Sequence, residues 1–181
     1  ELDVYLSSVT DHYATASICG PNSKKILNKL IPDLDLSDES FPHMSFKNTK
    51  IDNIKCRIMR ISFTGEHSYE INIQANYGED LWKKCMEAGE EFNITPYGTE
   101  TMHLLRAEKG FIIVGQDTDG TMTPIDLQMD WIVSKKKYDF IGKRSLYRSD
   151  TMKEGRKQLV GLVTDNPTEV LEEGAQIIAN T

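Results

Sequence analysis

The chain has 181 residues, of which 39% are hydrophobic, so it is long enough to bury a core and too apolar for a disordered chain. Its net charge of −7 and pI near 5.1 argue against a general nucleic-acid binder, because phosphate affinity comes mostly from Lys and Arg. No apolar run approaches the roughly 18 residues of a membrane span, so we expect no membrane insertion. Residues 1–4 have neither a basic start nor an apolar stretch, which predicts no signal peptide. The missing initiator Met indicates a chain cut from something longer.

The cysteines and histidines show no ligand spacing. Cys19, Cys56 and Cys85 are far apart and form no C-x-x-C pair, which is typical of small buried hydrophobes in a reducing compartment. The four histidines likewise lack the spacing of a zinc site, so no metal site is predicted. We therefore expect a cytoplasmic protein without a structural metal.

The first elements are a strand and a helix. Residues 13–19 predict a strand, and Gly20-Pro21 turns the chain into a helix that runs to about Ile31. Residues 32–53 are polar and hold two prolines, which predicts a loop with room for one short edge strand.

A hairpin follows. Residues 54–63 and 68–75 alternate apolar and polar side chains around a Thr-Gly-Glu-His turn, which predicts two antiparallel strands. The apolar phase shifts at Met59, which indicates a bulge or burial of both faces. A helix over residues 76–91 and a short strand over residues 92–95 complete the order β-α-β-β-α-β. That order is the split βαβ pattern of an α+β, ferredoxin-like fold.

The remainder divides into two parts. A third helix is expected from Gly98 to Gly110, followed by mixed loop and strand signals. Residues 157–163 and 174–178 look like strands, but two strands cannot bury a face alone. We interpret them as the opening of a second, β-rich domain, so that residues 1–150 form one domain and residues 156–181 begin another.

Two segments are richer in polar and aromatic side chains than packing requires. In residues 63–70, the Glu70 carboxylate could accept two parallel N–H donors, such as those of a pterin or guanidine edge. In residues 105–117, a charged helix end and an aromatic residue between glycines could line a cleft. A solvated strand or helix face is the plainer interpretation of both, and chemistry alone favours it. The chain has no G-x-G-x-x-G dinucleotide fingerprint.

Five motifs occur in order along the chain. They are ICGPNS at residues 18–23, RISFTGEHSYEI at 60–71, LRAEKG at 105–110, GQDTDGTMTP at 115–124 and DFIGK at 139–143. Together they resemble the aminomethyltransferase family, the glycine-cleavage T-protein group, over nearly the whole chain. The third and fourth motifs resemble one branch of it more closely, the α subunits of heterotetrameric sarcosine oxidases, in their C-terminal half.

The resemblance implies a tetrahydrofolate site. The family's motif glutamate, which holds the pterin edge, falls on Glu70, and the expected cofactor-binding set is Glu70, Phe63, Phe111, Arg106 and Tyr69. The chain departs from the family at three positions: Ser68 replaces a Gly, Phe63 a Tyr, and Met102 a folate-contacting Arg. Phe63 can pack on folate but cannot donate to it. The family's catalytic Asp lies upstream of the matched region, so the catalytic residues of this chain stay unknown.

The same resemblance implies an activity for the complete enzyme: oxidative demethylation of sarcosine to glycine, hydrogen peroxide and formaldehyde or 5,10-methylenetetrahydrofolate. FAD, FMN and NAD are then expected outside this chain, in the missing part of the α subunit or in partner subunits of the heterotetramer. We expect the chain alone to lack oxidase activity. A T-protein acting on an aminomethyl-lipoyl carrier, or a non-catalytic interaction module with the same fold, remains an alternative.

Overall fold

A computed structural model describes residues 2–178 of the chain. The chain divides into two compact units, Glu1–Ile112 and Ile113–Thr181. The domain boundary expected near residues 150–156 lies inside the second unit. No helix of the described part is long and apolar enough to cross a membrane.

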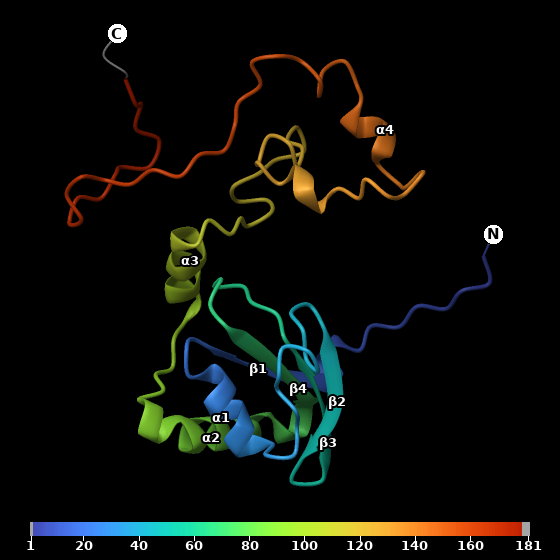
Figure 1. Ribbon diagram of the computed structural model, residues 1–181, viewed down its shortest axis with the longest axis vertical. Coiled ribbons are helices and arrows are strands. Elements are labelled where there is room, and N and C mark those ends of the chain that lie inside the picture. Colours follow the sequence, from blue (N-terminus) through green and yellow to red (C-terminus); the bar gives the residue numbers. More distant parts are fainter. Residues whose placement is uncertain (1, 179–181) are drawn as a thin grey trace. The chain divides into compact units, whose positions relative to one another are not determined.

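The first unit is a four-stranded antiparallel sheet with two helices packed on one face (Figure 1). The strands lie in the order β1-β4-β3-β2, and helices α1 and α2 contact β1 and β4. Their bounds are Tyr13–Cys19 (β1), Ser23–Leu30 (α1), Phe46–Ile51 (β2), Ile54–Met59 (β3), Ser68–Gln74 (β4) and Gly78–Gly89 (α2). A third helix, α3, spans Thr99–Glu108. The mixed α and β class is as expected.

The core lies between the helices and one sheet face. In β4, Tyr69, Ile71 and Ile73 are almost fully buried, whereas Glu70 and Asn72 between them are only half-buried. This alternation follows from the pleat, which sends successive side chains to opposite faces. We call the face that carries Glu70 and Asn72 the open face. The core is completed by Ile18, Ile26, Leu27, Ile31, Leu36, Phe41, Ile51, Cys56, Ile58, Leu81 and Cys85.

The split βαβ arrangement expected from the sequence is not formed. That pattern needs β1 parallel to the strand at residues 68–74, but the two are antiparallel, with Tyr13 opposite Gln74. The strand expected over residues 92–95 is also wrong. There the chain forms a 3-10 turn, Glu90–Phe92, and Asn93 adopts the left-handed conformation. Ile94 packs on Gly89, so its apolar side chain closes the end of α2 and does not join the sheet.

The fourth strand is β2, within the segment expected to be mostly loop. It pairs with β3 through a two-residue turn at Asp52 and Asn53, both with positive φ, which is the backbone of a tight type I′ hairpin. The hairpin of β3 and β4 is confirmed, with Cys56 opposite Ile73. Strand β3 ends at Met59, where the apolar phase shifts, so the shift marks a strand end and not a bulge.

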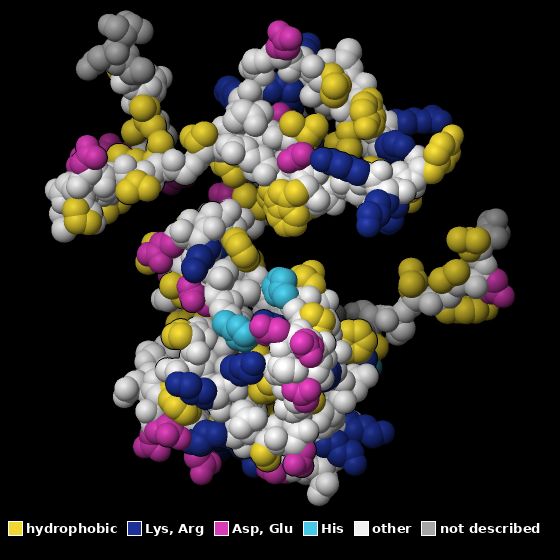
Figure 2. Space-filling view, viewed as in Figure 1, with side chains coloured by type: hydrophobic (Ala, Val, Ile, Leu, Met, Phe, Trp, Pro, Cys, Tyr) yellow, Lys and Arg dark blue, Asp and Glu magenta, His cyan; other side chains and the backbone are white. Residues whose placement is uncertain are grey.

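The second unit is mostly turns and irregular chain. Its described part contains a short helix, α4 (Lys143–Leu146), and a 3-10 turn, Asp130–Ile132. The strands expected over residues 157–163 and 174–178 are not formed there. Hydrophobic side chains stay exposed along both extended ends of the chain, as Figure 2 shows. The most exposed include Tyr5, Leu6, Val163, Val170 and Ile178.

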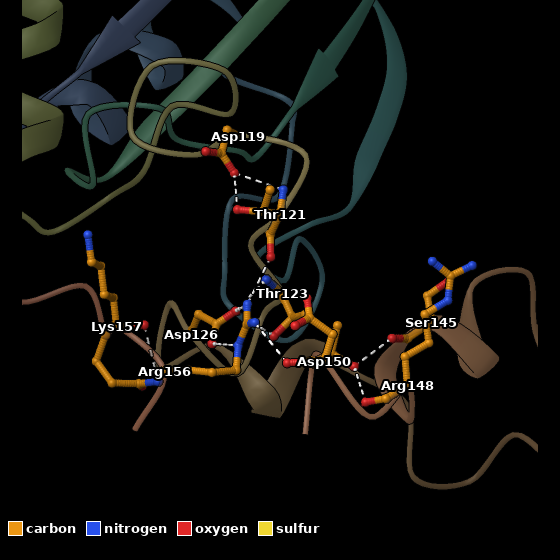
Figure 3. Close-up of polar contacts among 11 residues, drawn as sticks. Asp119, Thr121, Thr123, Asp126, Ser145, Arg148, Asp150, Arg156 and Lys157 are labelled. Atoms are coloured by element: carbon orange, nitrogen blue, oxygen red, sulfur yellow. Dashed lines mark hydrogen bonds and ion pairs between the residues drawn. The ribbon is translucent and has the colours of Figure 1, made fainter. Parts of the chain in front are cut away.

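One ion pair links two segments of the second unit (Figure 3). Arg156 donates from Nε to Asp126 Oδ1 at 2.8 Å and from Nη2 to Asp126 Oδ2 at 2.6 Å. Thr123 adds its backbone N–H and its hydroxyl to the same carboxylate at 2.8 and 3.0 Å, and Asp126 is only 3% exposed. The Arg156 guanidinium, the main cause, and the Thr123 donors hold the pKa of Asp126 well below its usual range. In place of regular strands, this contact ties residues 121–126 to Arg156.

Candidate functional site

The two segments singled out in the sequence meet in the first unit. The turn between β3 and β4 carries Gly65 and Glu66, and Lys109 follows α3. Lys109 Nζ lies 3.0 Å from Glu66 Oε1. A Cβ on Gly65 would stand 2.5 Å from Lys109 Cγ, and Gly65 has φ +77°, so only glycine allows this close approach without strain. The half-exposed ion pair contributes little energy, and the close packing of the Lys109 side chain on Gly65 is the main contact between the two segments.

The end of α3 explains much of the LRAEKG motif. Gly110 N–H bonds to Ala107 O at 3.0 Å and Phe111 N–H to Arg106 O at 2.8 Å, which is the paired closure of a Schellman turn. Gly110 has φ +75°, as that turn requires. Arg106 is 7% exposed, and its Nη1 donates to Phe111 O at 3.1 Å. The guanidinium of Arg106 thus fixes the backbone of Phe111.

The two aromatic residues expected to contact folate keep part of their rings accessible. Phe63 is 40% exposed in the turn that precedes β4, and Phe111 is 45% exposed just after α3. Large hydrophobic side chains of the core are under 10% exposed, so both rings are free to pack against a ligand.

Tyr69 and Glu70 are neighbours in β4 but point to opposite sides of the sheet. Tyr69 is completely buried in the core, with its hydroxyl 2.9 Å from His67 Nε2 and its ring 5.8 Å from that of Phe41. Glu70 lies on the open face. A ligand held by Glu70 would therefore not touch Tyr69, whose contacts fix the strand behind it.

Glu70 sits in the interior of the sheet and not at a solvated edge. It lies opposite Ser17 of β1 and Met59 of β3, so a strand flanks it on each side. Burial raises the pKa of Glu70, and no hydrogen-bond donor of the described residues offsets that rise. A half-buried carboxylate without donors is energetically costly, and donors on a ligand would remove that cost.

Tyr97 is a neighbour of the open face that the sequence reasoning missed. The Cys19 thiol donates to the Tyr97 hydroxyl oxygen at 3.1 Å, and Cys19 lies on the same sheet face as Ser17, two residues away. Burial is the main cause that raises the pKa of Tyr97 to about 12; Cys19 and the negative charge of Glu70 add to the rise, and a hydrogen bond with Ser17 opposes it. Tyr97 and Cys19 also line a groove of about 590 Å³ along the free edge of β1. Only the strand register could have revealed this neighbourhood.

The open face continues into a basic groove. This hollow of about 660 Å³ is lined from β3 by Lys55 and Arg57 and from β2 by Lys50. The Arg57 guanidinium lies 4.9 Å from the centre of the Phe46 ring. Asn72, next to Glu70 on this face, accepts from the Thr15 hydroxyl at 2.8 Å. The open face is thus polar, and the groove that adjoins Asn72 carries three cations, Lys50, Lys55 and Arg57.

The GQDTDGT motif forms turns within the second unit. Asp117 accepts from the backbone N–H of Ile113 at 2.8 Å, and Asp119 accepts from the N–H and hydroxyl of Thr121 at 2.8 and 2.6 Å. Thr121 O in turn accepts from Arg156 at 2.8 Å. The polar residues of this motif therefore shape the backbone in the way that Asx turns do.

The cysteines agree in part with the sequence interpretation. Cys56 and Cys85 are buried, and burial raises the pKa of each thiol to about 11. Cys19 is only partly buried and contacts Tyr97. No group of three or more potential metal ligands occurs within residues 2–178.

Comparison with known proteins places this arrangement in a family. Residues 1–137 match the model of the GCVT N-terminal domain, which is most of the chain. The chain therefore belongs to the GCVT N-terminal domain family, in agreement with the resemblance found in its motifs.

Within the family, the chain is similar to a particular kind of subunit. It is 53% identical over 181 residues to the sarcosine oxidase subunit alpha of Corynebacterium sp. (strain P-1), covering 99% of this chain and 19% of that protein. It is 39% identical to the sarcosine oxidase subunit alpha of Rhizobium meliloti (strain 1021), covering 99% and 18%. An aminomethyltransferase of Thermoanaerobacter sp. (strain X514) is 34% identical, covering 87% and 42%. The chain thus spans about a fifth of the length of the two oxidase subunits.

Proposed function

We propose that this chain is part of a sarcosine oxidase α subunit and supplies its tetrahydrofolate-binding region. The high identity to two such subunits, over 99% of the chain, supports this assignment above the aminomethyltransferase alternative. The complete enzyme would oxidise sarcosine to glycine and hydrogen peroxide and release formaldehyde or 5,10-methylenetetrahydrofolate. FAD, FMN and NAD would bind elsewhere in a cytoplasmic heterotetramer, through the rest of the α subunit and the other subunits.

The proposal within this chain depends on Glu70. A pterin edge offers two adjacent N–H donors, which a carboxylate accepts as a fork. Glu70 is half-buried, stands between two strands and has no donor of its own, so such an edge would satisfy it. That carboxylate is the observation that carries the proposal.

The other expected residues have supporting roles in this proposal. The exposed rings of Phe63 and Phe111 would pack against the ligand. Arg106 would act through the backbone of Phe111, which it holds. Tyr69 would fix β4 from the core side. Tetrahydrofolate, when bound, supplies the amines that take up the one-carbon unit, and this chain contributes catalysis by holding them in place.

The domain organisation remains part of the proposal. Residues 1–150 would form the folate-binding domain, and residues 156–181 would begin a β-rich, barrel-like domain. Val163 and Ile178 are 98% and 82% exposed, which supports strands that form only with partners outside this chain.

The test is Glu70→Gln in the intact protein. Glutamine keeps the shape but turns one acceptor into a donor that opposes the pterin edge. Losing one partner of a charge-assisted pair costs about 2 kcal/mol or more, which is roughly 30-fold in affinity. We expect tetrahydrofolate affinity to fall by that factor, sarcosine oxidation to stay nearly constant, and products to shift from methylenetetrahydrofolate to formaldehyde.

The matched control is Glu87→Gln, at an exposed position on α2. It removes the same charge far from the open face and should leave both products unchanged. An unaltered yield of methylenetetrahydrofolate from Glu70→Gln at limiting folate would show that Glu70 is only a strand residue.

A further inference from the structure

Tyr97 and Glu70 lie on the same face of the sheet, one step apart along β1. Cys19, which contacts the Tyr97 hydroxyl, pairs with Ser68, and Ser17, two residues earlier, pairs with Glu70. Residues two apart in a strand share a face and are about 7 Å apart. A flat ligand bound to Glu70 would therefore extend toward the Tyr97 hydroxyl.

The hydroxyl of Tyr97 is available as a donor. Its oxygen accepts from the Cys19 thiol at 3.1 Å, and the Ser17 hydroxyl is a second hydrogen-bond partner. Because both neighbours donate to the Tyr97 oxygen, the phenol's own proton is left for another acceptor. Burial, Cys19 and the nearby Glu70 charge raise its pKa, so the phenol stays protonated at neutral pH. Glu70 and Tyr97 together thus present two acceptor oxygens on Glu70 and, beside them, one donor on Tyr97.

We propose that Tyr97 determines which pteridines the site accepts, by donating to the oxygen at position 4 of the ring. This inference depends on the proposed function, because it assumes that Glu70 holds the 2-amino and N3 groups of the ligand. A 4-oxo pterin places two donors and one acceptor in a row along that edge, which matches the two residues. A 4-amino pteridine has no proton on N3 and places a donor where Tyr97 also donates, so it fits less well.

The experiment uses folic acid and 4-amino-folic acid, which differ at position 4 of the ring. Their dissociation constants are measured by calorimetry on the intact protein and on Tyr97→Phe, Glu70→Gln and Tyr77→Phe. Tyr77 is a control because it is a partly buried tyrosine packed against the core, away from Glu70. We expect Tyr97→Phe to weaken folic acid about 5- to 10-fold, the usual effect of one lost hydrogen bond. Binding of the 4-amino compound should change less than about twofold.

The outcomes separate the two proposals. If Glu70→Gln weakens folic acid but Tyr97→Phe does not, or if Tyr97→Phe weakens both ligands equally, the role of Tyr97 in selectivity is wrong while the folate site stands. If Glu70→Gln leaves the affinity for folic acid unchanged, the proposed function itself fails. Thermal unfolding midpoints of the variants confirm that each is folded, so an equal loss for both ligands is read as a structural role for Tyr97.

Discussion

The buried contact between Asp126 and Arg156 predicts how the second unit opens. Asp126→Asn keeps the shape of the side chain but removes its charge and sets an amide against the Arg156 guanidinium. Four hydrogen bonds converge on the carboxylate, two from Arg156 and two from Thr123. The described part of this unit contains only one short helix and one 3-10 turn. Few backbone hydrogen bonds of regular secondary structure would therefore hold this region if the contacts of Asp126 were lost.

The magnitude follows from the burial of Asp126. Hydrogen bonds to charged groups contribute about 1.5–3 kcal/mol each, but the asparagine retains some of the Thr123 contacts. Because the Arg156 guanidinium stays in contact with solvent, which weakens the pair, we expect a loss of about 1.5 kcal/mol in the local opening free energy at Asp126. At 1.4 kcal/mol per decade, this corresponds to roughly 10-fold faster amide exchange.

The assay is amide hydrogen exchange of the intact protein, read at two reporters. The N–H of Thr123 bonds to the Asp126 carboxylate, and the N–H of Leu159 bonds to Asp126 O at 2.8 Å. Lys153→Met is the matched control, because it breaks an exposed pair with Asp150 and should alter exchange little. Unchanged exchange at both reporters in Asp126→Asn would refute the idea that this pair links the two segments of the unit.

Two further predictions concern the first unit. Gly110→Ala places a side chain at φ +75° with open space around it, so backbone strain alone should lower stability by about 1–2 kcal/mol. Gly161→Ala, in the second unit at a position of ordinary φ with open space around it, should change the urea midpoint little, and equal effects of the two would contradict the Schellman closure. The pKa of Glu70 is raised, so its ionisation opposes folding as pH rises above that of the unfolded side chain, near 4.5. Glu70→Gln should therefore not lower the urea midpoint at neutral pH. A clearly lower midpoint would show that the Glu70 charge stabilises the fold.

The sequence predicted the elements whose own apolar residues recur at the period of a helix or a strand. The hairpin of β3 and β4 and the helix α1 have apolar residues at the correct period, and these elements formed as expected. The short edge strand allowed for within residues 32–53 is β2, but its position could not be given because only its two ends, Phe46 and Ile51, are strongly apolar and pairing with β3 determines its conformation. Ile94 led to the opposite error. Its apolar side chain suggested a strand over residues 92–95, but it packs against Gly89 at the end of α2.

The candidate site likewise contains residues that the sequence could predict and residues that it could not. Its motif residues could be found from resemblance, but which sheet face each one occupies depends on register. Tyr69 and Glu70 are adjacent, and no composition argument separates them, yet the pleat sends one to the core and the other to the open face. Tyr97 belongs to no motif, and its contact with Cys19, which lies opposite Ser68, brings it near the face that carries Glu70.

The motifs themselves combine two kinds of residue, and the structure separates them. Gly65, Arg106 and Gly110 shape the backbone: one accommodates Lys109, one holds Phe111 and one closes α3. Glu70, in contrast, has a raised pKa and no donor among the described residues, so nothing in its contacts explains its presence in the sheet. A half-buried carboxylate in that position lowers the free energy of unfolding, whereas a leucine or threonine would fit the same pleat without that cost. Because folding does not require this charge, a ligand that supplies N–H donors is the simplest physical reason for it.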